Sequence, residues 1–281
     1  MSEPDYYLRT TCRMCGGLAL RRVMALQPTP PGNNFLKESQ LGQPEPVYPL
    51  DLHLCGDCGH VQVGHVVDPK ILYLNSYSYV SGTSPVFVSH LREYAAHVIE
   101  RFGLKPGALV VDIGSNDGTA LRFFAEAGMR VLGVDPAVEI AARATQSGIP
   151  TVCDFFSHDL AVRLRTDHGP AAFITSHNAC AHIDGLDGVF AGVEHWLDDA
   201  GVFGCEVGYF LDVFENTWFD TIYHEHLDYH TVGPFRRLLS RVGMMPLRVE
   251  RVSPQGGSIR LFAQKTTGPR REDETIDALI E

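Results

Sequence analysis

From residue 108 onward, short apolar runs alternate with segments whose apolar residues recur at helical spacing. Alternation of this kind predicts a parallel β-sheet with helices packed on both of its faces. The predicted strands are 108–113, 130–134, 150–153, 171–176 and 201–207, and the predicted helices lie near 119–127, 136–147, 158–165 and 185–196.

The end of this pattern narrows the choice among α/β folds. A further helix is predicted at 231–242, followed by strands at 245–252 and 258–264 that are separated only by residues 253–257. Because so short a connection can join only antiparallel strands, the sheet should end in a hairpin. A parallel sheet that ends in an antiparallel hairpin is typical of class I S-adenosylmethionine-dependent methyltransferases, and we therefore expect their Rossmann-like fold.

The first part of the chain has a different composition. Residues 1–68 are rich in Pro, Gly and Cys and lack long periodic patterns, whereas 69–107 carry a helical repeat that ends at a Lys-Pro-Gly break. We expect a small metal-binding module over 1–68, a helical linker over 69–107 that contributes to the acceptor site, and a cofactor-binding methyltransferase domain over 108–267.

Two matched CxxCG motifs hold Cys12 with Cys15 and Cys55 with Cys58. Each CxxC turn directs two thiolates at one ion, and two such turns complete the tetrahedral set that zinc prefers. Four protein thiolates leave no open position on the metal, so the Zn²⁺ should be structural. The alternative is ordinary thiols or two disulfides, although a disulfide within a CxxC turn would constrain little. The remaining cysteines should be small buried apolar residues: Cys153, Cys180 and Cys205.

A glycine-bearing loop follows the first predicted strand of the sheet. Gly114 and Gly118 have GxxxG spacing, which lets the backbone pass close to a ligand at the start of a helix. The spacing differs from the GxGxxG of dinucleotide-binding loops, and the flanking Asp112 and Asp117 would repel a pyrophosphate. Both carboxylates suit the positively charged end of S-adenosylmethionine, which we expect as the cofactor, with NAD as the alternative. Other loop residues expected to contact it are Ser115 and Asn116.

Later strand ends extend the predicted cofactor site. Asp135 ends the second strand, where an acidic side chain typically binds both ribose hydroxyls. Asp154 and Phe155 end the third strand, and we expect them to flank the adenine through an amino-group contact and ring packing. Asn178 follows the fourth strand, at the same ligand-lining edge of the sheet.

Composition narrows the range of partners. The chain of 281 residues is 44% hydrophobic and 20% charged, which is ordinary for a globular protein, and its formal net charge is −11. An acidic protein repels phosphate backbones, which argues against binding to nucleic acid polymers. The chain has no apolar run long enough to span a membrane and no start typical of a signal peptide. We therefore expect a cytoplasmic protein that does not bind membranes.

The densest group of titratable side chains starts at Tyr223. Three histidines, two tyrosines and a glutamate lie within residues 223–230, which indicates acid–base chemistry. A second metal site or a solvated polar loop is the alternative. The His-Glu-His order lacks the HExxH spacing of zinc hydrolases, which argues against that class of enzyme.

Together these motifs resemble those of the sugar C-methyltransferases, which act on nucleotide-linked keto-deoxysugars and include the enzyme that makes tetronitrose. The resemblance implies an enzyme that adds a methyl group to the carbon beside a ketone. It implies that His226 is the base, that Tyr223, Glu225 and His182 are further active-site residues, and that Tyr77, in preference to Tyr79, helps to hold the sugar. The shared segments are CRMCG, LCGDCGHVQ, YSYVSGTSP, VVDIGSNDGT, GVDPA, NACAHI, FDTIYHEHLDY and GGSIRLF.

Members of this family carry a further C-terminal domain that helps to bind the nucleotide. Residues 268–281 correspond to the start of the link to that domain, which we expect to be absent from this chain. Two alternatives therefore stay open beside sugar C-methylation. One is methylation of another small-molecule acceptor, for example at oxygen, and the other is a non-catalytic module that binds zinc and cofactor.

Overall fold

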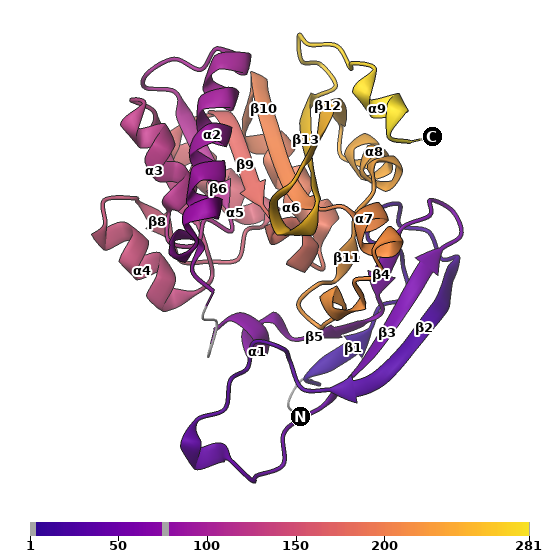
Figure 1. Cartoon of the computed structure of the whole chain (residues 1–281). Helices are drawn as coiled ribbons and strands as arrows, with labels where there is room; N and C mark the ends of the chain where they lie inside the picture. The colour runs from indigo at the N-terminus through magenta and orange to yellow at the C-terminus, as the bar shows by residue number, and fades with distance from the viewer. Residues whose placement is uncertain (1–3, 75–78, 281) are drawn as a thin grey trace.

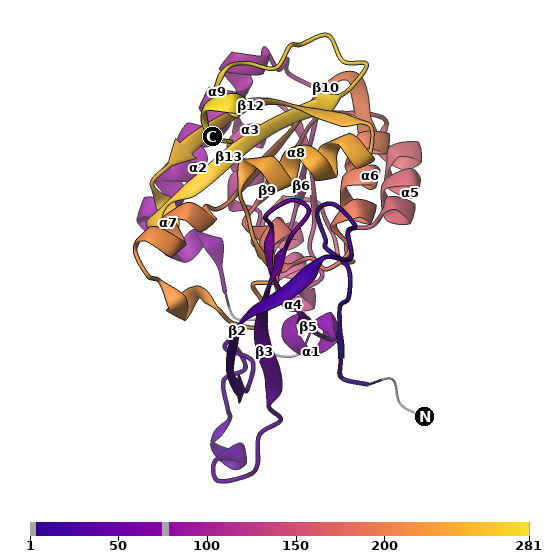
Figure 2. The same cartoon turned by 90° about the vertical axis from the view of Figure 1, so that its right-hand side faces the viewer.

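The computed structural model describes residues 4–74 and 79–280, which fold into two parts (Figure 1). The larger part contains a seven-stranded sheet, and the smaller part is built on a four-stranded sheet. Figure 2 shows the smaller part, drawn in indigo, below the edge of the larger one. Among the described residues, no helix is long and apolar enough to cross a membrane.

The seven-stranded sheet has the order β12-β13-β10-β9-β6-β7-β8. Strands β6 to β10 pair in parallel, and β13 inserts between β10 and β12 with antiparallel pairing to both. This is the predicted class I methyltransferase fold, including its terminal hairpin. The strands are β6 (Leu109–Ile113), β7 (Arg130–Val134), β8 (Thr151–Val152), β9 (Ala171–His177), β10 (Leu197–Gly208), β12 (Met244–Val252) and β13 (Ser258–Lys265).

Helices cover both faces of this sheet, and each face has its own apolar core. α2 (Pro85–Phe102) and α3 (Thr119–Glu126) pack on one face, around the buried Phe173 of β9. α2 begins where Ser84 caps its first turn and ends at Gly103, whose φ of 62° only glycine adopts readily. The opposite face is covered by α5 (His158–His168), α6 (Leu186–Trp196) and α8 (Val232–Arg241), and α4 (Val138–Gln146) lies beside β8.

The smaller sheet has the order β11-β4-β3-β2, all antiparallel. Three of its strands come from the N-terminal module, but β11 (Asp228–Tyr229) lies within the histidine-rich segment 223–230. The pairing of β11 with β4 therefore attaches that segment to the N-terminal module. The other strands are β2 (Leu20–Thr29), β3 (Tyr48–Cys55) and β4 (Val61–Val63), and β1 (Tyr6–Leu8) pairs with β5 (His65–Val67) beside them.

Several short helices and turns complete the two parts. The predicted helical repeat over 69–107 consists of two helices, because α1 (Pro69–Tyr73) is separate from α2. Two further short helices are α7 (Phe210–Glu215) and α9 (Thr275–Ala278). Single 3₁₀ turns are η1 (Glu38–Gln40), η2 (Ser81–Thr83), η3 (Ala179–His182), η4 (Phe219–Thr221) and η5 (Pro254–Gly256).

Candidate active site and metal centre

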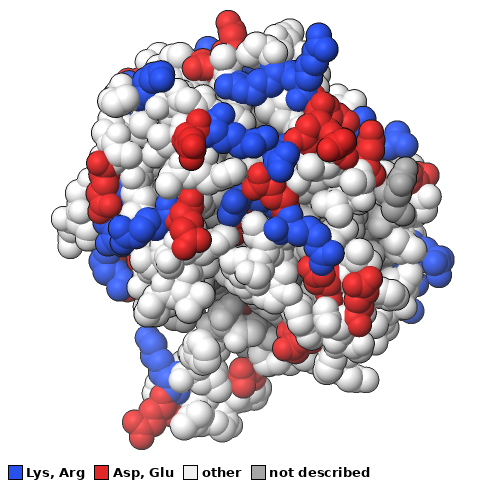
Figure 3. Space-filling model, turned by 45° about the horizontal axis from the view of Figure 1, so that its top comes forward, with Lys and Arg blue, Asp and Glu red and all other residues white. Residues whose placement is uncertain are grey.

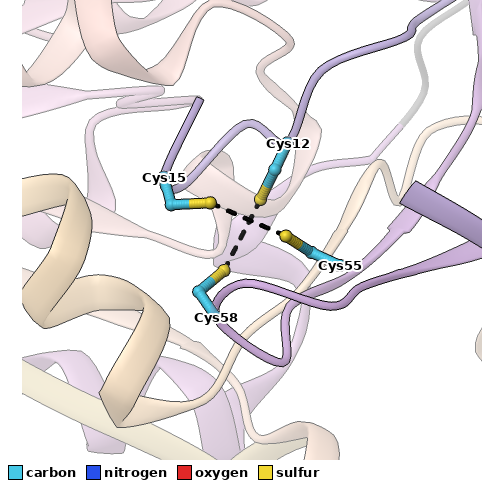
Figure 4. A group of neighbouring side chains, drawn as sticks. All are labelled: Cys12, Cys15, Cys55 and Cys58. Atoms are coloured by element: carbon cyan, nitrogen blue, oxygen red, sulfur yellow. Dashed lines mark hydrogen bonds between the residues drawn. The ribbon is translucent and has the colours of Figure 1, made fainter. Parts of the chain in front are cut away.

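The four cysteines of the two CxxCG motifs converge on one point (Figure 4). Their sulfur atoms all lie within 4.8 Å of one another, and the Cys12–Cys58 and Cys15–Cys55 Sγ pairs are each 3.6 Å apart. Tetrahedral zinc with Zn–S bonds of about 2.3 Å separates its sulfur ligands by about 3.8 Å. The cluster therefore fits a structural Zn²⁺.

Each pair of cysteines sits in a tight turn, which we call a knuckle. The first knuckle lies between β1 and β2, and the second is the turn that joins β3 to β4. Gly16 and Gly59 follow the pairs with φ of 75° and 76°, a conformation that closes the turn and that other residues rarely adopt.

The remaining cysteines differ from one another. Cys180 and Cys205 are buried, as predicted, but Cys153 is exposed. The prediction for Cys153 is wrong because it follows the two-residue β8, which is the edge strand of the sheet and has no neighbour to cover its end.

One cavity, of ≈ 530 Å³, opens at the carboxyl ends of the parallel strands. It is lined from one side by the loops after β6, β7, β8 and β9, and from the other by α1, the segment 221–229 and the turn of the terminal hairpin. The cavity thus brings the predicted cofactor and acceptor residues together. Those that line it are Gly114, Asn116, Asp135, Phe155, Asn178, His182, Tyr223 and His226.

The cofactor side is held together by Asp135. Its Oδ2 accepts a hydrogen bond from the Asn116 backbone N–H and its Oδ1 accepts one from the Ala137 N–H, each at 2.9 Å. The carboxylate is only 6% exposed, and each oxygen keeps a lone pair for a ligand hydroxyl. Gly114 has a φ of 73°, and an added Cβ would lie 2.4 Å from the Ala179 side chain. The site therefore fits the ribose and the close backbone approach that S-adenosylmethionine needs.

Other predicted cofactor residues shape the loop without lining the cavity. Asp117 accepts hydrogen bonds from the Gly82 and Thr119 N–H groups. It therefore links the loop to the turn before α2 and to the first residue of α3. Ser115 is a buried residue of the loop itself, whereas Asp154 is exposed, with Arg163 at 3.7 Å.

Burial, with the charge of Asp135 added to it, raises the pKa of the buried Asp112 well above its usual range. Gly118 has a φ of 78° and an added Cβ would meet Ile149 at 2.9 Å. Direct contact of these loop residues with a cofactor stays a prediction.

On the acceptor side, His226 and Tyr223 form a hydrogen-bonded pair. His226 Nδ1 lies 2.9 Å from the Thr221 carbonyl oxygen, which can only accept, so Nδ1 carries the proton and Nε2 does not. The Tyr223 hydroxyl lies 2.7 Å from Nε2 and therefore donates to it. The His182 ring is centred 5.0 Å from that of His226, and its Nδ1 lies 3.3 Å from the Tyr73 hydroxyl.

Burial dominates the titration of these groups. It lowers the pKa of His226, against the opposing effects of the Thr221 carbonyl and the Glu225 charge. It lowers the pKa of His182 to about 3, with His226 as the second cause. It raises the pKa of Tyr223, to which Glu225 also contributes. Both histidines are therefore neutral and the tyrosine keeps its proton near pH 7.

Glu225 is not among the residues that line the cavity, although its hydrogen-bond partner Asn33 is. Glu225 is buried, and its Oε1 accepts a hydrogen bond from the Asn33 backbone N–H at 3.1 Å. Tyr77 lies outside the described residues. Tyr79, the other candidate for the tyrosine that holds the sugar, lines the cavity.

Sequence reasoning did not single out His177, the last residue of β9. Its side chain lines the cavity, and both ring nitrogens are buried without a partner in the described part of the chain. Its ring packs edge-on against Tyr94, with centroids 4.5 Å apart, and burial lowers its pKa to about 4. Its place immediately before Asn178, at the end of a parallel strand, is the signal that could have identified it.

Comparison with protein families identifies the family of each part of the chain. Residues 87–249, more than half of the chain, match a family model described as a methyltransferase domain. The chain belongs to the methyltransferase family. Residues 12–73, which contain all four clustered cysteines, match a family model for a zinc binding domain. The predictions of a methyltransferase fold for S-adenosylmethionine and of a zinc-binding module in front of it are confirmed.

Individual relatives of this methyltransferase agree with the family. C-methyltransferase NovU of Streptomyces niveus is 34% identical over 252 residues, which are 90% of this chain and 60% of NovU. The chain thus spans less than two thirds of that relative's length. This identity supports the predicted resemblance to the sugar C-methyltransferases.

Solved structures share the fold at low sequence identity. Magnesium protoporphyrin IX methyltransferase of Synechocystis PCC 6803 with bound SAH gives a TM-score of 0.50 at 16% identity, over 70% of this chain and 92% of that one. The plantazolicin methyltransferase BpumL in complex with SAH gives 0.50 at 12% identity, over 64% and 83% of the two chains. These likenesses concern the methyltransferase fold alone.

Zinc content tests the metal centre. We expect about one Zn²⁺ per chain, because the thiolates complete a tetrahedral set. Cys12→Ser should lose the metal and loosen the N-terminal module, while Cys153→Ser, which lies outside the cluster, should keep it. Elemental analysis and limited proteolysis measure both effects. Reduced wild-type protein without metal would contradict the assignment.

Titration calorimetry tests the ribose contact. Asp135→Ala should bind S-adenosylmethionine about tenfold more weakly or worse, because a hydrogen bond to a charged group contributes about 1.5–3 kcal/mol. Asp159→Ala, which removes an exposed carboxylate on α5, serves as the matched control. Unchanged affinity in Asp135→Ala would remove this residue from the ribose role.

Proposed function

We propose that this methyltransferase adds a methyl group to a carbon atom beside the ketone of a deoxysugar. One observation carries the proposal, namely that the His226–Tyr223 pair opens into the same cavity as the Asp135 carboxylate. A carbon atom becomes a nucleophile only after a base removes its proton. A neutral imidazole beside a protonated phenol meets that demand. Methylation of a sugar hydroxyl also uses a base, but it forms no enolate oxygen that the phenol would stabilise.

The geometry supports His226 Nε2 as the base. The Thr221 carbonyl holds the Nδ1 proton, which leaves the Nε2 lone pair directed at the cavity side where Tyr223 lies. The Glu225 carboxylate could also act as a base by its chemistry, but it is absent from the cavity wall and accepts a hydrogen bond from the Asn33 backbone. It acts on His226 through its charge, which raises the pKa of the imidazole against the effect of burial.

The Tyr223 hydroxyl stabilises the negative charge that develops on the ketone oxygen when the base removes the proton. This hydroxyl donates to Nε2 in the structure, and a ketone oxygen placed beside it would take that hydrogen bond. Nε2 then becomes free for the neighbouring C–H, whose proton moves to the imidazole while the electron pair moves toward the ketone oxygen. His182 is neutral near pH 7 and can donate a second hydrogen bond to that oxygen.

The cofactor and the acceptor share one enclosed space. When bound, S-adenosylmethionine supplies an electrophilic methyl group, and Asp135 and the Gly114 backbone would hold its nucleoside and amino-acid parts. Apolar side chains from both parts of the protein enclose the acceptor end and exclude water from the reacting atoms: Val66, Leu72, Phe210, Val213 and Trp218.

The charge of the cavity wall favours an uncharged sugar ring over a pyrophosphate as the group bound there. Among the described residues, the cavity wall includes neither Lys nor Arg. On the face in Figure 3 acidic and basic side chains are interspersed, without a large basic area. A nucleotide attached to the sugar would therefore lie outside the cavity. The nucleotide linkage itself rests on the resemblance to the sugar C-methyltransferases.

Replacement of His226 tests the base. His226→Ala should keep its affinity for S-adenosylmethionine but lose methyl transfer and exchange of the α-proton with deuterated water, each by about 10²–10⁴. Exchange isolates proton removal from methyl transfer. Mass spectrometry of keto-sugar nucleotides measures both, with His168→Ala on the surface of α5 as the control.

Normal exchange in His226→Ala would assign the base elsewhere. If wild-type protein exchanges no ketone substrate and methylates a hydroxyl instead, the proposal of carbon methylation is wrong.

The pH profile of exchange gives a second test. Since only neutral His226 accepts a proton, kcat/KM for exchange should rise as pH rises through a pKa below the ordinary histidine value of 6.5. It should stay level above that pH, because burial raises the pKa of Tyr223 above that of an ordinary tyrosine.

Glu225→Gln should move the rise to lower pH, because it removes the charge that raises the imidazole pKa. A rise centred well above pH 6.5, or one that Glu225→Gln moves upward, would contradict this assignment.

A further inference from the structure

Each zinc knuckle contributes a buried side chain that reaches the segment just after His226. Arg13 lies between the cysteines of the first knuckle, and His60 lies two residues beyond Cys58 of the second. Arg13 is 1% exposed and His60 is fully buried. A buried guanidinium is costly unless acceptors are placed around it, so the groups that Arg13 Nε and Nη1 contact indicate the role of this residue.

Arg13 binds both histidine-bearing segments of the active site. Its Nη1 donates to the Leu227 carbonyl at 3.2 Å and to the Val63 carbonyl at 2.9 Å. Its Nε donates to Asp184 Oδ1 at 2.8 Å. Leu227 follows His226 directly, and Asp184 lies two residues after His182. One guanidinium therefore holds the backbone next to His226 and a carboxylate close to His182 in the chain.

His60 reaches the same place from the second knuckle. Its Nε2 lies 2.7 Å from Asp228 Oδ1, and both side chains are completely buried. Arg13 Nε lies 3.9 Å from the other oxygen of Asp228. Side chains from the two knuckles therefore meet on the dipeptide 227–228.

The backbone transmits this attachment to the catalytic ring. Leu227 N–H donates to the Ala181 carbonyl at 2.8 Å, which sets the distance between the segments that carry His226 and His182. A shift of the dipeptide would move the His226 imidazole relative to Tyr223 and to the ketone. A displacement of about 1 Å at a catalytic group can lower a rate about a hundredfold.

We propose that the zinc module positions the catalytic base, with Arg13 as the positioning residue between the metal site and His226. Zinc fixes the knuckle, the knuckle fixes the Arg13 guanidinium, and the guanidinium fixes the backbone at Leu227. The catalytic consequence rests on the proposed function, whereas the structural coupling does not.

Arg13→Met tests the coupling, because it keeps the length of the side chain and removes its donors. Arg241→Gln is the matched control, since Arg241 donates to the Met14 carbonyl of the same knuckle at 3.0 Å but reaches it from α8. The readout is the ring ¹H–¹⁵N spectrum of ¹⁵N-histidine-labelled protein, with the His226 signals identified by their loss in His226→Asn.

In Arg13→Met the His226 signals should shift or broaden while those of His90 on α2 stay in place, and zinc content and S-adenosylmethionine affinity should be retained. The kcat for α-proton exchange should fall about tenfold to a hundredfold with KM unchanged, and Arg13→Lys should restore part of it. Arg241→Gln should match the wild type in every respect.

Wild-type His226 signals in zinc-loaded Arg13→Met would overturn the inference, whatever the catalytic rate. If Arg13→Met loses zinc or fails to fold, chelation of the wild-type protein replaces it. Zinc-free protein should then show shifted His226 signals, and unshifted signals would equally overturn the coupling. Failure of the proposed function appears separately, as wild-type protein with a normal His226 spectrum and no exchange of any ketone.

Discussion

The whole acceptor site depends on the pairing of β11 with β4. This pairing joins only Asp228 to Gln62 and Tyr229 to Val61 across the two strands. The pairing nevertheless determines where the polar segment before β11 lies, because that segment cannot move away from the N-terminal sheet unless the hydrogen bonds between β11 and β4 break. This strand, which comes late in the sequence, completes a sheet that begins near the N-terminus and so places residues 221–229 on the cavity wall.

The histidine-rich segment buries several polar side chains, and such side chains need hydrogen-bond partners. His224, Glu225, Asp228 and His230 are all less than 5% exposed, and polar groups so placed must find partners or lose stability. The N-terminal module supplies several of these partners, including the Tyr48 carbonyl for His224 at 3.1 Å. The histidine-rich segment and the zinc module thus stabilise each other, which explains why neither is simply an appendage of the methyltransferase sheet.

Sequence periodicity was sufficient to predict the large sheet, because most of its strands and helices are long enough for the pattern of apolar residues to repeat. It failed for the smaller sheet for a physical reason. β2 is exposed along most of its length and so lacks an alternating pattern, and β4 and β11 are only three and two residues long. The pairing of β4 with β11 joins residues that are far apart in the chain, and a local sequence pattern cannot predict such a pairing.

The site was predicted unevenly for similar reasons. The cysteine spacing and the strand-end position of Asp135 are local signals, and the structure places these residues together or on the cavity wall. Asp154 has an equally plausible local position, but its side chain is exposed beside Arg163 and does not line the cavity; β8, which precedes it, is only two residues long. The role of Arg13 had no sequence signal, because the residues it binds lie more than a hundred positions away in some cases.

The turn of the terminal hairpin has an evolutionary consequence. Gln255, with a φ of 55°, and Gly257 reach the acceptor end of the cavity from a turn whose strands belong to the cofactor-binding sheet. Gly256 is constrained, since an added Cβ would meet Trp218 at 2.5 Å, but Gln255 is exposed and contributes nothing to the core. Substitutions at Gln255 by residues that tolerate a positive φ, such as asparagine or glycine, would therefore change the wall of the cavity and leave the sheet intact. A lineage of such enzymes could change its substrates one residue at a time without ever losing its hold on the methyl donor.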